Sequence, residues 1–113
     1  MTQHDDNVRL GHMLEYAREA CALTQGRTRA DLLADRVLEL ALTRLLEVVG
    51  EAANCVSEPT QARHPQIPWR NIIGLRNRLI DGYEAVDDDI MWEIIEHDLP
   101  PLISALTKIF EER

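Results

Sequence analysis

The segment from Thr28 to Ser57 contains no proline and a single glycine, and its apolar residues recur at helical spacing. This pattern predicts one long helix, with Thr28 and Asp31 forming a capping box at its start. The apolar residues fall on two sides, namely Leu33, Val37, Leu40, Ala41, Val48 and Ala52 on one, and Leu38, Leu42, Leu45, Val49 and Val56 on the other. One face of a bundle needs fewer, so the surplus favours a homodimer.

Glycine and proline divide the rest of the chain into three more helical stretches and one irregular connection. The helices are expected from Asp5 or Asp6 as cap to Thr24, from Pro68 to about Ile80, and from Asp87–Asp89 onward with a kink at Pro100-Pro101. The connection is "SEPTQARHPQIP", and Gly26 and Asp81-Gly82 end the helices before them. Long helices with short connections predict an all-α, antiparallel up-and-down four-helix bundle. With 113 residues, the chain is expected to form one domain over 1–113.

The opening residues and the cysteines indicate the cellular compartment. The opening "MTQHDDNVRL" is polar, and Cys21 and Cys55 do not form a CxxC pair. We therefore expect a cytoplasmic protein with reduced thiols. Apolar runs are too short to span a membrane, so no membrane association is expected.

Charge is distributed unevenly along the chain. The formal net charge of −8 argues against nonspecific binding to nucleic acid, and DNA is not an expected partner. Residues 59–80 nevertheless contain four arginines, Arg63, Arg70, Arg76 and Arg78, and no acid. Arg70, Arg76 and Arg78 are candidates for contacts with a phosphate or a carboxylate. Alternatively, these arginines pair with acids on neighbouring helices, as exposed charges usually do.

The usual signatures of metal and nucleotide chemistry are missing. The four histidines, His4, His12, His64 and His97, do not pair at i,i+4 or with a cysteine, so neither a metal nor a cofactor is predicted. Asp87–Asp89 lack the oxygen pattern of a calcium loop and suit the start of a helix better. No glycine-rich phosphate loop or serine nucleophile motif is present.

The stretch "RNRLIDGY" contains several polar residues close together at the end of one expected helix. Arg76, Asn77 and Arg78 precede Asp81 and Tyr83, and the turn can bring an acid and a phenol near the Arg76 guanidinium. Asp81 is disfavoured at the negative end of a helix dipole. One interpretation is a phosphate site, and the other is a structural ion pair between Arg76 and Asp81 with Tyr83 packed on the bundle.

Three segments, in order, resemble the HepT-like branch of the HEPN superfamily over nearly the whole chain. They are "LEVVGEAANCVS", "HPQIPWRNIIGLRNRLIDGY" and "DDDIMWEIIEHDLPPLISAL". The family motif is an Arg, four to six residues, then His, commonly followed by any residue and Tyr. Arg76 matches the Arg, Asn77 the frequent polar residue after it, and Tyr83 the Tyr. Asp81 occupies the histidine position.

The resemblance implies a function as well as a fold. Such proteins are metal-independent RNases with two motif copies at a homodimer interface, and they act as toxins beside a minimal nucleotidyltransferase antitoxin. That partner attaches AMP to the motif tyrosine, which makes Tyr83 the expected acceptor. The implied substrate is RNA, either tRNA or mRNA, and the implied catalytic positions are Arg76, Asn77 and Asp81. With RNA as the ligand, Arg70, Arg76 and Arg78 are the expected phosphate contacts.

Asp81 puts the ribonuclease activity of this chain in doubt. Cleavage through the 2′-hydroxyl needs a base, an acid and cations on the phosphorane. An aspartate with an ordinary pKa near 3.9 is anionic at pH 7, so it is a poor acid and repels phosphate. We expect strongly reduced cleavage, and the alternative function is a non-catalytic helical module that binds a nucleotidyltransferase or serves as its substrate.

Overall fold

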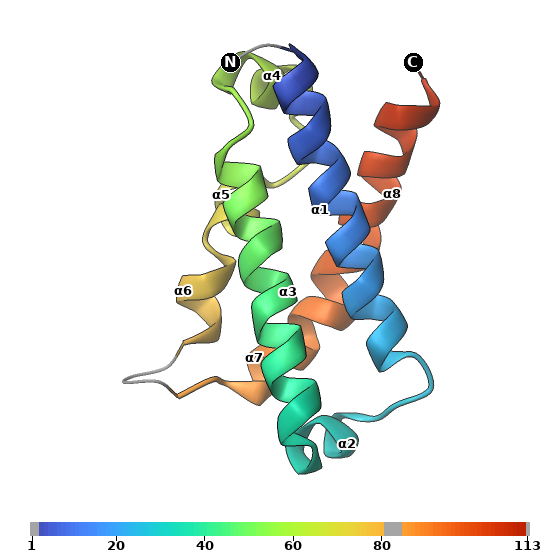
Figure 1. The fold of residues 1–113 in the computed structure, drawn as a ribbon, viewed down its shortest axis with the longest axis vertical. Helices are drawn as coiled ribbons and strands as arrows, with labels where there is room; N and C mark the ends of the chain where they lie inside the picture. The colour runs from blue at the N-terminus through green and yellow to red at the C-terminus, as the bar shows by residue number, and fades with distance from the viewer. Residues whose placement is uncertain (1–2, 81–84, 113) are drawn as a thin grey trace.

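The computed structural model describes residues 3–80 and 85–112, and helices account for most of this part of the chain. In chain order they are α1 (Gln3–Thr24), α2 (Arg29–Ala34), α3 (Arg36–Asn54), α4 (Glu58–Arg63), α5 (Trp69–Ile73), α6 (Leu75–Leu79), α7 (Asp88–Glu93), the π-helical turn η1 (Ile94–Asp98) and α8 (Leu99–Glu111). The helices α1, α3 and α8 form the long body, and α5 and α6 flank α3 (Figure 1). The prediction of an all-α, HEPN-like fold is confirmed.

Helix α3 lies at the centre of the core. It packs along α1 and also contacts α5 and α6. Its side toward these helices is buried through Leu38, Leu42, Leu46, Val49 and Ala53. Burying a Leu or Val side chain contributes about 1.5–3 kcal/mol relative to exposure, so this face supplies a large share of the packing energy.

The second apolar side of the long segment is partly open. Leu33 and Leu40 are 59% and 53% exposed, and Val37 is 75% exposed. These three residues lie where α2 meets α3, at the lower end of the molecule in Figure 1. The surplus of apolar surface noted in the sequence is therefore real at this corner.

The expected single helix from Thr28 to Ser57 is wrong. The predicted capping box is present, because Thr28 and Asp31 exchange their side-chain and backbone hydrogen bonds at the start of α2. The helix then breaks at Asp35, whose carboxylate accepts from the backbone N–H of Leu38 at 3.0 Å. An aspartate at this position competes well for a free backbone donor, and it starts α3 as a separate helix.

Asp6 has a different role from the cap that the sequence predicted. Helix α1 already begins at Gln3, and Asp6 is buried. Its carboxylate accepts from the Ser57 backbone N–H at 2.9 Å, the Ser57 hydroxyl at 2.6 Å and the Thr60 hydroxyl at 2.5 Å. Asp6 thus caps α4, a helix within the connection that was expected to be irregular, and it ties this helix to α1.

The expected helix from Pro68 to Ile80 is also interrupted. Gly74 ends α5 and begins α6. Just before it, α3 approaches closely at Gly50, where an added Cβ would lie 3.0 Å from the Ile72 carbonyl oxygen and 3.4 Å from that of Ile73. Only glycine permits this approach of a helix to backbone carbonyls without displacement. Gly50 therefore helps to set where α5 ends and α6 starts.

The kink predicted at Pro100-Pro101 is present and takes the form of a wide turn. The Leu99 N–H donates to the Ile94 carbonyl, five residues back. Neither proline has an N–H, and each ring would clash with the carbonyl four residues earlier, so a regular helix cannot run through them. The π-helical turn η1 widens the helix at that point. Within residues 3–80 and 85–112, no helix combines the length and apolarity needed to cross a membrane.

We predict that Asp6→Ala lowers the free energy of unfolding by about 1–3 kcal/mol, because Ser57 and Thr60 lose a buried acceptor. The three hydrogen bonds lower the pKa of Asp6 from 3.8 to about 2, with the Ser57 and Thr60 hydroxyls as the main causes. This contribution is complete above about pH 4 and is lost as the pH falls through about 2. Urea unfolding at pH 7 and pH 3 measures both effects.

The matched control is Glu15→Ala, which removes an exposed acid from the same helix. It should leave stability nearly unchanged. Equal losses in the two variants would show that the Asp6 hydrogen bonds do not hold α4 in place.

Candidate functional site

Part of the family motif lies outside the described residues. Residues 81–84 are not described, so the structure does not locate Asp81 or Tyr83 and does not test their proximity to Arg76. The residues on either side are located. Ile80 and Val86 form an isolated antiparallel bridge, which brings the end of α6 next to the segment that leads into α7.

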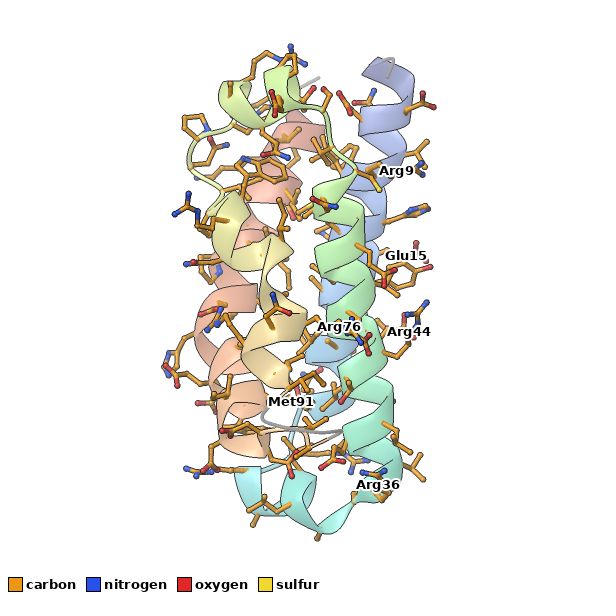
Figure 2. The ribbon with its side chains drawn as sticks, turned by 90° about the vertical axis from the view of Figure 1, so that its left-hand side faces the viewer. Arg9, Glu15, Arg36, Arg44, Arg76 and Met91 are labelled. Atoms are coloured by element: carbon orange, nitrogen blue, oxygen red, sulfur yellow. The ribbon has the colours of Figure 1, made fainter. Side chains whose placement is uncertain are left out.

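Arg76 extends from α6 toward α3. Its guanidinium Nε lies 3.5 Å from a carboxylate oxygen of Glu47, and the side chains are 71% and 22% exposed, respectively. Figure 2 shows Arg76 between the ribbons of α6 and α3. An ion pair this open to water contributes about 0–1 kcal/mol, so Arg76 is easily available to another anion.

Arg76 and Asn77 line one shallow cavity of about 230 Å³ between α3 and the α5–α6 segment. Gly50 and Ile73 form its apolar part, at the close helix contact described above. The cavity can hold a small anionic group, because a guanidinium donates two parallel hydrogen bonds to phosphate or carboxylate and an amide adds a neutral donor. Two of the predicted site residues are thus brought together.

The other two predicted phosphate-binding arginines point elsewhere. Arg78 donates to the Asp98 carboxylate in η1, with 2.6 Å between the two atoms. Arg70 is exposed on α5, and no ion pair to it is found in the described part of the chain. The alternative interpretation, pairing with acids on neighbouring helices, describes Arg76 and Arg78. The structure does not gather the three arginines into one patch.

Two acids of α3 belong to this site and were missed in the sequence. Glu47 contacts Arg76, and Glu51 lines the same cavity and lies 3.7 Å from Arg44. The sequence held one signal, a glycine in the middle of a helix, which often marks a close approach. Gly50 lies between these acids, but nothing local indicated which helix would pack there.

Comparison with known proteins establishes the family. Residues 13–109 match the family model described as "Ribonuclease HepT-like". This chain belongs to the HepT-like ribonuclease family. The match extends from the middle of α1 almost to the end of α8, so it covers most of the helical body, including α6 with Arg76.

Relatives with curated names agree with this HepT-like assignment. A "Probable ribonuclease HepT" of Thermococcus cleftensis is 34% identical over 85% of this chain and 91% of its own length. A "Putative RNase" of Caldanaerobacter subterraneus is 31% identical, with 91% of this chain and 92% of the relative covered. Another of Methanocaldococcus jannaschii is 28% identical over 90% of this chain and 94% of its own. No solved structure matches.

An acidic contact lies at the start of α7 in this HepT-like chain. Asp87 caps α7 by accepting from the Ile90 N–H, as predicted for this acidic start. Burial, together with a hydrogen bond to Glu39 on α3 and repulsion by Glu39, Asp87 and Asp89, raises the pKa of Asp88 from 3.8 to about 6. Arg36 pairs with Glu39 and Arg29 with Asp89, whereas no cation pairs with Asp88 in the described part of the chain.

We predict that Asp88→Asn raises the stability of the protein at pH 7–8. Because the folded-state pKa is raised, the stabilising contribution of the Asp88 proton is complete below about pH 4 and disappears as the pH rises through about 6. The amide keeps a donor toward Glu39 at every pH. Melting temperatures between pH 4 and 8 should vary less in the variant than in the parent chain.

Asp89→Asn removes the same formal charge one residue away and serves as the control. Asp89 is exposed and paired with Arg29, so its loss should not raise stability. If the melting temperature of Asp88→Asn depends on pH as that of the parent chain does, the raised pKa of Asp88 does not contribute to stability.

Proposed function

We propose that this chain is the toxin component of a prokaryotic toxin–antitoxin system and that it binds RNA phosphate at the cavity of Arg76 and Asn77. The observation that carries the proposal is an exposed arginine, at the family motif position, beside a cavity on a HepT-like fold. The names of the relatives, which call them RNases or ribonucleases, support RNA as the ligand.

To bind phosphate at this site, Arg76 exchanges its ion-pair partner. Arg76 leaves a weak, solvent-screened contact with Glu47 and gains charge-assisted hydrogen bonds to phosphate oxygens. Glu47 and Glu51 oppose an incoming anion, and Arg44 offsets part of their charge. One copy of the site therefore binds RNA weakly, and a second Arg76 from a partner subunit would strengthen the binding.

A homodimer supplies that second copy. The apolar corner of Leu33, Val37 and Leu40 gives the chain a surface that a partner would cover. In a two-fold dimer each subunit would present the same corner to the other, with the two Arg76 side chains toward a common cleft. Two Arg76 side chains would then stabilise the doubly negative phosphorane that forms during cleavage.

Asp81 lowers the rate at which this site is expected to cleave RNA. The cleavage reaction needs a proton donor for the leaving 5′-oxygen, and an aspartate near a phosphate is deprotonated at pH 7. We infer that the chain binds RNA but cleaves it slowly. The second candidate function, favoured by the same residue, is a non-catalytic module recognised by a nucleotidyltransferase.

We predict that Asp81→His increases RNA cleavage by about 10²-fold or more, since general acid–base groups contribute about 10²–10⁴-fold. Cleavage of tRNA and mRNA by the parent and the variant gives the measurement. Asp81→Asn is the matched control, because it removes the negative charge without adding a proton carrier. It should strengthen RNA binding and leave cleavage slow.

Arg76→Ala in the Asp81→His background should abolish the gain while leaving the melting temperature nearly unchanged, because Arg76 is exposed. If neither His nor Asn at 81 cleaves any RNA and binding to a nucleotidyltransferase persists, the chain is a binding module instead.

We predict a homodimer at micromolar concentration that depends on the apolar corner. Val37→Asp places a charge on its most exposed residue and should convert the dimer to a monomer, as light scattering would show. Val8→Asp changes another exposed valine, on α1, and should leave the dimer intact. A monomeric mass for the parent chain at high concentration would contradict the proposal.

We predict that a cognate nucleotidyltransferase adds AMP to Tyr83. The phosphodiester would lie near Arg76, where it would occupy the place of RNA phosphate and silence the site. Incubation with the partner, ATP and magnesium, followed by intact mass and peptide mapping, should show one added AMP that is absent in Tyr83→Phe. The control is Tyr16→Phe, the other tyrosine, which packs partly buried against the core. Modification that persists in Tyr83→Phe would exclude this residue.

A further inference from the structure

A second cavity shares no lining residue with the Arg76 site. It has a volume of about 270 Å³ and lies between the connection that precedes α5 and the η1–α8 turn. Its apolar walls come from Ile67, Pro68, Leu102 and Ala105. Ile67 and Leu102 are buried core residues, so this part of the cavity is rigid. A flat apolar ring of limited size would fit such walls.

The polar groups of this cavity are on its rim. They are Gln66, Asn71, His97 and Asp98. The first three are exposed, and their side chains form no hydrogen bond with the described residues, so the fold does not use them. Two amides and an imidazole supply both donors and acceptors at the edge of an apolar space.

The wide turn η1 helps to place two of these groups. Pro100 and Pro101 prevent a regular helix, and the extra residue in the turn changes the direction of the side chains before it. His97 and Asp98 are the last two residues of that turn, and both reach the cavity. Such π-helical turns are often found at functional sites.

Asp98 connects this cavity to α6. One carboxylate oxygen accepts from Arg78 at 2.6 Å, and the carboxylate is 27% exposed, so it can also accept from a ligand. Arg78 is thus fixed at the edge of the cavity as a cation. A ligand that enters the cavity and carries a phosphate would meet this guanidinium outside the apolar walls.

We propose that this cavity binds one nucleobase of the RNA, a base with an exocyclic amino group. Its ring would lie between the proline and aliphatic side chains, its amino group would donate to Asp98, and its other edge atoms would bond to Asn71 or Gln66. RNA-binding proteins read single-stranded bases in this way, by enclosing the ring and bonding to its edge. The inference rests on the proposed RNA-binding function, to which it adds a base preference.

The test is binding of 5′-mononucleotides to the full chain, followed by NMR. GMP, AMP and CMP should perturb amide signals in residues 66–71 and 98–105. UMP, which lacks an amino group, should bind roughly tenfold more weakly, the scale of one good base-edge contact. Ribose 5-phosphate reports binding through phosphate alone and should not perturb these signals.

Two variants locate the site. Ala105→Leu fills the cavity and should reduce nucleotide binding by roughly tenfold or more, while Ser104→Leu, exposed one residue earlier, should not. Asn71→Ala removes an exposed rim amide without affecting the core, so it tests the site even if Ala105→Leu is poorly folded. Gln25→Ala, an exposed amide away from the cavity, is its control.

The outcomes separate this inference from the proposed function. Equal binding of ribose 5-phosphate and the nucleotides, binding unaffected by both cavity variants, or no binding at all would overturn the nucleobase site. RNA cleavage by Asp81→His together with any of those results would leave the proposed function standing. Nucleotide binding that is sensitive to the cavity variants, with no cleavage by any variant, would support the base site and reject the ribonuclease.

Discussion

The close packing of α3 on the carboxyl end of α5 is the contact on which the candidate site depends. Gly50 allows the α3 backbone to approach the Ile72 and Ile73 carbonyls, and α6 starts immediately after this contact. Arg76 follows one residue into α6 and therefore reaches Glu47 on α3. A Cβ at position 50 would press on these carbonyls, so the two elements would have to shift apart by a few tenths of an ångström.

Breaks in the helices create both candidate surfaces of this HepT-like fold. The break at Gly74 separates α5 from α6, and the π-helical turn before Pro100 and Pro101 exposes His97 and Asp98. A continuous bundle would bury its helix faces against one another and leave few polar groups beside apolar cavities. The irregular turns thus place the polar side chains beside the two cavities. The regular packing of α1 on α3 contributes to stability instead.

Arginine–carboxylate pairs near the two cavities bear on how this acidic protein would bind an anionic ligand. Arg76 and Arg78 each have a carboxylate partner, Glu47 and Asp98, respectively. Arg76 is 71% exposed and 3.5 Å from Glu47, so it can exchange partners at little cost, whereas the closer contact with Asp98 holds Arg78 in place. Binding of RNA through this surface should accordingly be weak in one subunit and sensitive to salt.

Sequence patterns determined the features that depend on near neighbours along the chain. They include the helical content, the capping box at Thr28, the acidic start at Asp87 and the kink at the paired prolines. Each follows from interactions over a few residues, such as a cap with a free N–H or a proline with the preceding turn.

Only the tertiary structure decided the features that depend on distant partners. Asp6 lies 51 residues before Ser57, so its pattern suggested a cap for its own helix, whereas the fold uses it to cap α4. The break at Gly74 coincides with the approach of α3, and the divergence of Arg76 and Arg78 depends on acids from two different helices. A single sequence does not reveal which of its segments will pack together, because that choice minimises the free energy of the whole core.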